Sequence, residues 1–116
     1  MAKNIEITKP ITLEVDGTTY TLEFNRNSVM SAERAGFRTE LITEQPMNML
    51  PLLFYAAFKK NHPRITRDET DAILFDRLGG LNQAVIERLA QLYAEPTKTL
   101  IRNDDYGDEK NVKISL

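Results

Sequence analysis

The chain has 116 residues, no cysteine and a formal net charge of -2 at pH 7, from 15 basic and 17 acidic residues. This length suits one domain with its own hydrophobic core. The near balance of charge argues against a nucleic-acid partner, and the lack of cysteine removes disulfides, thiolate nucleophiles and cysteine-based zinc sites. No apolar run approaches the roughly 20 residues of a membrane span, so we expect a cytoplasmic protein without a membrane partner.

Residues 11–24 predict an antiparallel β-hairpin. Apolar and polar residues alternate on both sides of Asp16-Gly17, a dipeptide that favours a two-residue type I′ turn. This turn pairs Val15 with Thr18 and places the apolar residues of both strands on one face. Two strands cannot cover their own apolar face, so helices must lie against it.

Helical periodicity predicts about four helices after the hairpin, near residues 27–35, 48–60, 67–78 and 82–95. Asn25 or Asn27 should cap the first helix and Gly36 should end it. Pro51 should lie in the first turn of the second helix, because a proline deeper inside removes a hydrogen bond. Thr66 begins a T-x-x-E capping box for the third. The expected fold class is therefore α+β and mostly helical.

The single domain should span residues 1–101, followed by an acidic, flexible tail over 102–116. The acidic run 103–109 departs from the pattern of a calcium-binding loop, which favours a charged tail. At the end of the tail, Val112, Ile114 and Leu116 alternate with polar residues. This alternation is typical of a strand, which could pair with the edge of a sheet.

Catalytic patterns are absent from the sequence. The single histidine, His62, stands in an Asn-His-Pro helix stop, where a solvent-facing or capping role is expected. The acids of the third predicted helix have no histidine beside them and suit a solvated face better than a metal pair. We therefore expect no enzyme, no cofactor and no metal.

The stretch from Leu50 to Phe58 contains no charged residue. One interpretation is the central core helix of a small domain, which is apolar on all sides. The other is a helix whose exposed side binds a client protein or a second copy, and the two are compatible. The candidate protein-binding residues are Leu50, Leu53, Phe54, Ala57 and Phe58. The unpaired edge of the hairpin is a second docking candidate.

Residues 12–37 resemble the opening of a family of phage proteins, the tail assembly chaperones of long-tailed phages and prophages. The resemblance extends to about residue 95. It is carried by Asp16-Gly17, Tyr20, Leu22, Phe24, Asn25, Glu33, Gly36-Phe37, the helix Leu53 to Phe58 and the start Ile65 to Glu69.

This resemblance implies a non-enzymatic chaperone that holds tape-measure helices and recruits tail-tube subunits. Such a protein acts in the cytoplasm of the bacterial host, is absent from the mature virion, and often exists in a second, frameshifted form with an extension after about residue 102. Self-association is left open. The alternatives are a minor structural or connector protein of the virion, and a small adaptor or antitoxin-like binding protein.

Overall fold

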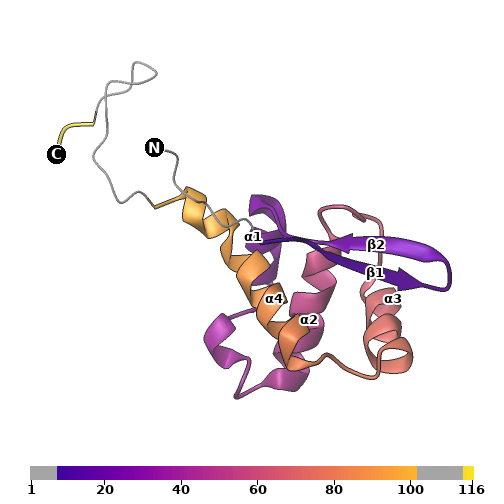
Figure 1. The fold of residues 1–116 in the computed structure, drawn as a ribbon. Coiled ribbons are helices and arrows are strands. Elements are labelled where there is room, and N and C mark those ends of the chain that lie inside the picture. The colour runs from indigo at the N-terminus through magenta and orange to yellow at the C-terminus, as the bar shows by residue number, and fades with distance from the viewer. Residues whose placement is uncertain (1–7, 102–113) are drawn as a thin grey trace.

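The fold is α+β, as the sequence predicts, with a two-stranded hairpin first and helices after it (Figure 1). The computed structural model describes residues 8–101 and 114–116, so most of the predicted tail, 102–113, lies outside the described residues. Within the described part, no helix has the length and apolar character needed to cross a membrane. The elements are β1 (Ile11–Val15), β2 (Thr18–Leu22), α1 (Arg26–Arg34), η1 (Thr39–Leu41), α2 (Pro46–Phe58), α3 (Arg67–Ala72), η2 (Ile73–Arg77), α4 (Gln83–Ala94) and η3 (Pro96–Thr99).

The hairpin has the predicted turn and register. Asp16 and Gly17 have φ angles of 51° and 84°, the two consecutive positive values that a type I′ turn requires. Val15 pairs with Thr18 at the turn, and the ladder continues in register to the first residue of β1. The apolar face of the ribbon packs against the helices, as Leu22, which is almost fully buried, illustrates.

The first helix, α1, begins and ends where the sequence predicts. Asn25 is its N-cap: the side-chain Oδ1 accepts a hydrogen bond from the Ser28 N–H at 2.8 Å, and the Ser28 Oγ accepts one from the Asn25 N–H at 2.9 Å. Beyond the helix, Gly36 adopts a φ of 100°. The N–H of Phe37 then donates to the Ala32 carbonyl at 2.9 Å, and the Phe37 ring is buried in the hydrophobic core.

The start of α2 differs from the prediction. The helix begins at Pro46, so Pro51 lies inside it and not in its first turn. Pro46 suits the first helical position because its fixed φ matches the helix and its missing N–H has no intrahelical partner there. Pro51 has no N–H to donate to the Met47 carbonyl, so the helix lacks one of its intrahelical hydrogen bonds close to its start.

Helix α2 is the centre of the fold. It contacts β2, α1, α3 and α4, and so it is covered on most of its circumference (Figure 1). Seven of its residues are buried: Met49, Pro51, Leu53, Phe54, Ala56, Ala57 and Phe58. The interpretation of this uncharged stretch as a central core helix is therefore confirmed.

The third predicted helix, 67–78, is only partly α-helical. Its capping box is present, since Thr66 and Glu69 each accept a hydrogen bond from the other's N–H. After Ala72 the helix continues as the π-helical segment η2, and the N–H of Leu78 donates to the Ile73 carbonyl five residues back, at 2.8 Å. A single π turn inside a helix is uncommon and often marks a functional region.

Tyr93 of α4 should make the stability of the fold depend on pH in the alkaline range. Its ring packs edge-on against Phe24 and Phe37, at centroid distances of 5.3 and 4.7 Å. Burial, reinforced by the Glu33 carboxylate, raises the pKa of Tyr93 from 10.0 to about 12. The unfolded chain therefore loses this proton first, and stability should fall as pH rises from 10 towards 12.

The variant Tyr93→Phe tests this expectation. It keeps the ring but removes the ionisable hydroxyl, so its free energy of unfolding should fall less over the same pH interval. Urea unfolding monitored by circular dichroism measures both slopes. Equal slopes in the two proteins would assign the alkaline loss to other groups.

Candidate functional site

The structure buries most of the residues that the sequence nominates for protein binding. Leu53, Phe54, Ala57 and Phe58 are at most 1% exposed. The expected docking surface on this face of α2 is therefore corrected: the hairpin and the neighbouring helices occupy it, and these four side chains form the core. Leu50 is only half-buried and lines a surface groove, and the buried ring of Phe54 contributes to the floor of another.

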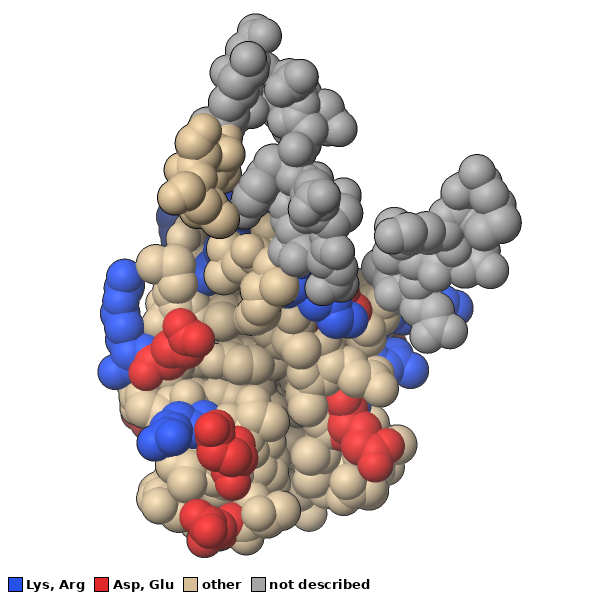
Figure 2. Space-filling model, turned by 90° about the vertical axis from the view of Figure 1, so that its left-hand side faces the viewer, with Lys and Arg blue, Asp and Glu red and all other residues tan. Residues whose placement is uncertain are grey.

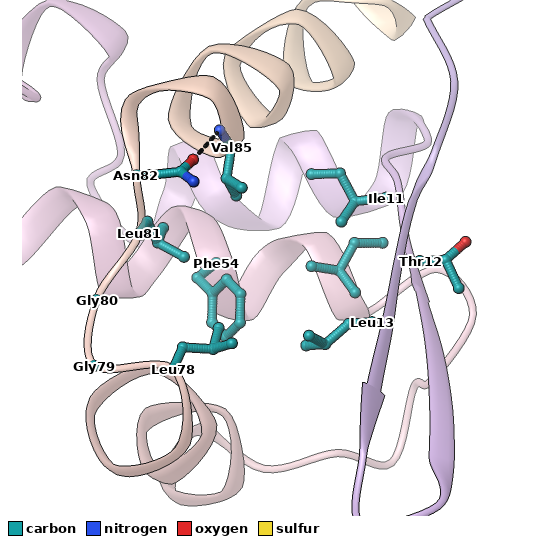
Figure 3. A pocket seen from close by; sticks show the side chains of 11 residues that line it. Ile11, Thr12, Leu13, Phe54, Leu78, Gly79, Gly80, Leu81, Asn82 and Val85 are labelled. Atoms are coloured by element: carbon teal, nitrogen blue, oxygen red, sulfur yellow. Dashed lines mark hydrogen bonds between the residues drawn. The ribbon is translucent and has the colours of Figure 1, made fainter.

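One groove, here called the hairpin groove, separates β1 from the start of α4 and has a volume of about 530 Å³. Ile11, Leu13 and Val85 point into it, and Phe54 forms part of its floor (Figure 3). The side chain of Thr12 points away, so the strand presents its backbone and its apolar side chains to the groove. Such a groove suits an extended apolar segment with alternating side chains.

A second groove, here called the helix groove, lies at the start of α2 and has a volume of about 120 Å³. Gly80 and Leu81 line both grooves, so the two meet at the corner between η2 and α4. Around this corner, Met47, Phe75 and Leu78 are 75%, 49% and 41% exposed. The corner patch is defined here as Met47, Leu50, Phe75, Leu78 and Leu81.

Local backbone geometry explains the exposure of the corner patch. In a regular α-helix, Leu78 would share a face with the buried Leu74, four residues earlier. The π turn spaces these residues differently, and the chain then leaves the helix through two consecutive positive φ angles, 67° at Gly79 and 105° at Gly80. Only glycine adopts such angles readily, so this corner depends on both residues.

Polar contacts tie both ends of β1 to the helices that border the hairpin groove. At the turn, Arg77 of η2 forms an ion pair with Asp16. At the other end, Arg88 of α4 donates to the Lys9 carbonyl at 3.3 Å. These contacts are exposed and contribute little stability individually, but they hold the strand at a set distance from the corner.

Charges of both signs are interspersed over the face seen in Figure 2, with uncharged surface between them. No one-signed field dominates that face, in agreement with the formal net charge of -2. Among the described residues, no group of three or more histidine, aspartate or glutamate side chains is placed to hold a metal ion. The acids of α3 illustrate this, because Glu69 caps its own helix and Asp71 pairs with Arg67 at 3.0 Å.

The outer edge of β2 is closed by the segment that follows α2. The N–H of Thr21 donates to His62 Nε2 at 3.0 Å, and Asn61 Nδ2 donates to the Thr21 carbonyl at 3.1 Å. Next to them, the N–H of Glu23 donates to the Ala57 carbonyl at 3.1 Å. The hydrogen bond from Asn61, assisted by the nearby Lys60 ammonium, lowers the pKa of Glu23.

The outer edge of β1 is open by comparison. In a two-residue hairpin the residues of the closing pair, Val15 and Thr18, bond to each other, so Thr12 and Glu14 direct their N–H and C=O groups away from β2. Thr21, the partner of Thr12, bonds outward to His62 and Asn61, which confirms that this pair of residues directs its backbone groups away from the other strand. Within residues 8–101 and 114–116, no hydrogen bond to the outward backbone groups of Thr12 and Glu14 is present.

His62 is half-buried and holds the edge of β2, a role that its sequence context did not indicate beyond a general tendency to cap. Its ring also packs edge-on against Tyr20 at 5.1 Å. We expect His62→Ala to lower the free energy of unfolding by about 1 to 3 kcal/mol, because the Thr21 N–H loses its acceptor and the ring contact disappears. Urea unfolding gives the energy.

Hydrogen exchange at the Thr21 amide separates the two causes. This amide should exchange faster in His62→Ala, whereas the variant His62→Gln, which retains an acceptor at the end of its side chain, should restore part of the protection. Unchanged exchange at Thr21 in the alanine variant would show that the hydrogen bond contributes nothing to the closure of this edge.

Comparison with known proteins identifies one match. No curated protein and no solved structure shows significant similarity to the chain. A family model described as a domain of unknown function, DUF5055, matches residues 1–116. The chain therefore belongs to the DUF5055 family.

Proposed function

We propose that this protein is a tail assembly chaperone of a long-tailed phage or prophage, a non-enzymatic protein that holds apolar helices of the tape-measure protein and recruits tail-tube subunits. The proposal combines the resemblance of residues 12–37 with the corner patch. Because the expected face of α2 is buried, we place the docking site on the surface around Leu78 instead. No cofactor, nucleic acid or membrane takes part in the proposed activity.

The corner patch is the observation that carries the proposal. Five apolar residues from three segments of the chain meet there, at the junction of two grooves. An exposed apolar patch beside a groove is typical of a protein-binding site. An amphipathic helix binds such a surface through apolar residues spaced three and four positions apart, the pattern that the helices of a tape-measure protein would supply.

A chaperone role also suits a patch of only five apolar residues. A chaperone must release its client when the tail assembles, so a small apolar contact is preferable to a large obligate interface. The patch depends on side chains such as Met47 and Phe75, and methionine adapts its shape to different apolar partners. A surface of this kind holds successive helices of similar character without strict sequence selectivity.

Co-purification with the two proposed clients tests the function. The protein is co-expressed with the tape-measure and tail-tube proteins of the same phage or prophage, and one partner carries an affinity tag. We expect the tape-measure protein to co-purify and to remain soluble only when this chain is present. Absence of binding, under conditions in which both clients stay soluble, would contradict the proposal.

Mass spectrometry of purified virions separates a chaperone from a structural component. A chaperone acts in the cytoplasm of the host cell and leaves before the particle is complete, so its peptides should be missing from the virion. Peptides present at a level comparable to those of known tail proteins would instead support a connector or minor virion protein.

A further inference from the structure

We infer that two copies of this chain associate through the open edge of β1, so that their two-stranded hairpins join into one continuous antiparallel sheet. The two β1 strands then run side by side about a two-fold axis, the commonest symmetry of protein dimers. This inference goes beyond the proposed function and does not depend on it, because it concerns the hairpin and not the corner patch. It is supported by the backbone groups of β1, by its apolar side chains and by its charges.

The open edge of β1 supplies the backbone groups for this pairing. Thr12 and Glu14 direct their N–H and C=O groups away from β2, and no hydrogen bond to these groups is present among the described residues. The opposite edge of the ribbon is already closed by Asn61 and His62. Proteins often protect an exposed edge with lysine, proline or a bulge, and the five residues of β1 contain none of these. The edge of β1 is therefore a template for pairing with another strand.

The apolar side chains of β1 are incompletely covered. Ile11, Leu13 and Val15 are all half-buried, whereas Leu22, which lies opposite Ile11 on β2, is 1% exposed. Ile11 and Leu13 point into the hairpin groove, which leaves them partly open to solvent (Figure 3). A second β1 strand would place its own apolar side chains beside them, because an added strand continues the alternation of the sheet. The pairing would therefore bury apolar surface on both copies.

Symmetry and hydrogen bonding together select the register. With the two-fold axis at Leu13, this residue lies opposite its own copy, and Thr12 lies opposite Glu14 of the second copy. Both members of such a pair direct their backbone groups outward, so each of the two equivalent pairs exchanges both of its hydrogen bonds across the interface. An axis at Glu14 would place two acids opposite each other, and an axis at Thr12 would pair Glu14 with Pro10, which has no N–H. The register centred on Leu13 avoids both faults.

The charges along the strand favour the same antiparallel arrangement. Lys9 lies just before β1, and Arg88 of α4 donates to its carbonyl at 3.3 Å, so the start of the strand is basic. The other end carries Glu14 and Asp16, of which Asp16 pairs with Arg77. An antiparallel pair brings the basic start of each strand beside the acidic end of the other, which is favourable at both ends of the interface. A parallel pair would align like charges instead.

Sedimentation equilibrium of the full chain measures the association. An interface built on one strand edge is small, so we expect a reversible dimer whose fraction rises with protein concentration. The exposed position Thr12 offers a matched pair of variants. Thr12→Lys gives an opposite-charge pair with Glu14 of the second copy at both symmetric positions, and Thr12→Glu gives a like-charge pair at both.

The dissociation constant of the dimer should be lower for Thr12→Lys than for Thr12→Glu by about tenfold or more. Because the position is exposed, both variants should fold as the wild type does, and circular dichroism checks this. Equal dissociation constants for the two variants would overturn the inference. A wild-type chain that stays monomeric up to about 1 mM would overturn it as well.

A cysteine placed on the axis tests the register directly. The chain contains no cysteine, so every disulfide of a single-cysteine variant must join two copies. On the axis, the Cα atoms of the two Leu13 residues would lie about 4.5 Å apart, within the range that a disulfide spans. The two Thr12 residues would lie about 8 Å apart on the diagonal of the pair, and a disulfide does not span more than about 7 Å. Leu13→Cys should therefore form a covalent dimer in air, and Thr12→Cys should not.

The comparison of these two cysteine variants separates paired strands from random collision. Thr12 is the more exposed of the two positions, so disulfides from random collision would form there at least as fast as at Leu13. Preferential cross-linking at Leu13 supports the inference, and cross-linking at Thr12 that equals or exceeds it would overturn it. None of these measurements includes a client protein, so failure of this inference is distinguishable from failure of the proposed function.

Discussion

Phe58→Ala should lower the free energy of unfolding by about 3 to 5 kcal/mol, the largest effect expected of a single substitution in this chain. The Phe58 ring is fully buried and packs edge-on against Phe54 and Tyr20, at centroid distances of 5.0 and 5.4 Å. Truncation removes these contacts and leaves a cavity at the centre of the fold. Because small domains have a total stability of about 5 to 15 kcal/mol, the variant should be partly unfolded at 37 °C.

Urea unfolding at 25 °C, monitored by circular dichroism, measures this loss. Phe58→Leu is the matched control, since it keeps most of the buried apolar volume and should cost considerably less than the alanine variant. A second control is Leu50→Ala, on the same helix but half-buried, whose loss should also be smaller. A Phe58→Ala protein as stable as the wild type would contradict the placement of this side chain in the core.

Local patterns in the sequence predicted the hairpin and the starts of α1 and α3 well, whereas the predicted start of α2 was wrong. Asp16-Gly17 defines the turn and thereby the register, because few other residues tolerate two positive φ angles in succession. Asn25 and Thr66 cap their helices through side-chain hydrogen bonds to residues only three positions later in the sequence. Interactions that close within one turn can be inferred from a short stretch of sequence, although the sequence left Asn25 and Asn27 as alternative caps of the first helix.

The candidate site could not be located in the same way, because it depends on contacts between distant segments. The uncharged stretch of α2 fits both a core helix and a docking helix, and only the packing of β2 and α4 on its sides decides between them. The π turn that exposes Leu78 leaves no recognisable periodic signal in the sequence. Two consecutive glycines such as Gly79-Gly80 are typical of a helix end, but they carry no signal for the exposed apolar patch beside them.

Exposure of the corner patch allows client binding to be separated from folding. Phe75→Lys combined with Leu78→Lys should reduce capture of the tape-measure protein by about tenfold or more, because two apolar anchors are lost and two charges are introduced into an apolar contact. Since both side chains are already 49% and 41% exposed, the free energy of unfolding should change by only about 1 kcal/mol or less.

The matched control is Met30→Lys combined with Leu100→Lys. It adds the same charge and removes two exposed apolar side chains, 42% and 72% exposed, but both lie beside α1 and η3, away from the corner. Co-purification measured by quantitative immunoblot should therefore fall for the corner variant and not for the control. Equal loss in both variants would indicate a general effect of charge, and undiminished capture by the corner variant would exclude Phe75 and Leu78 from the client contact.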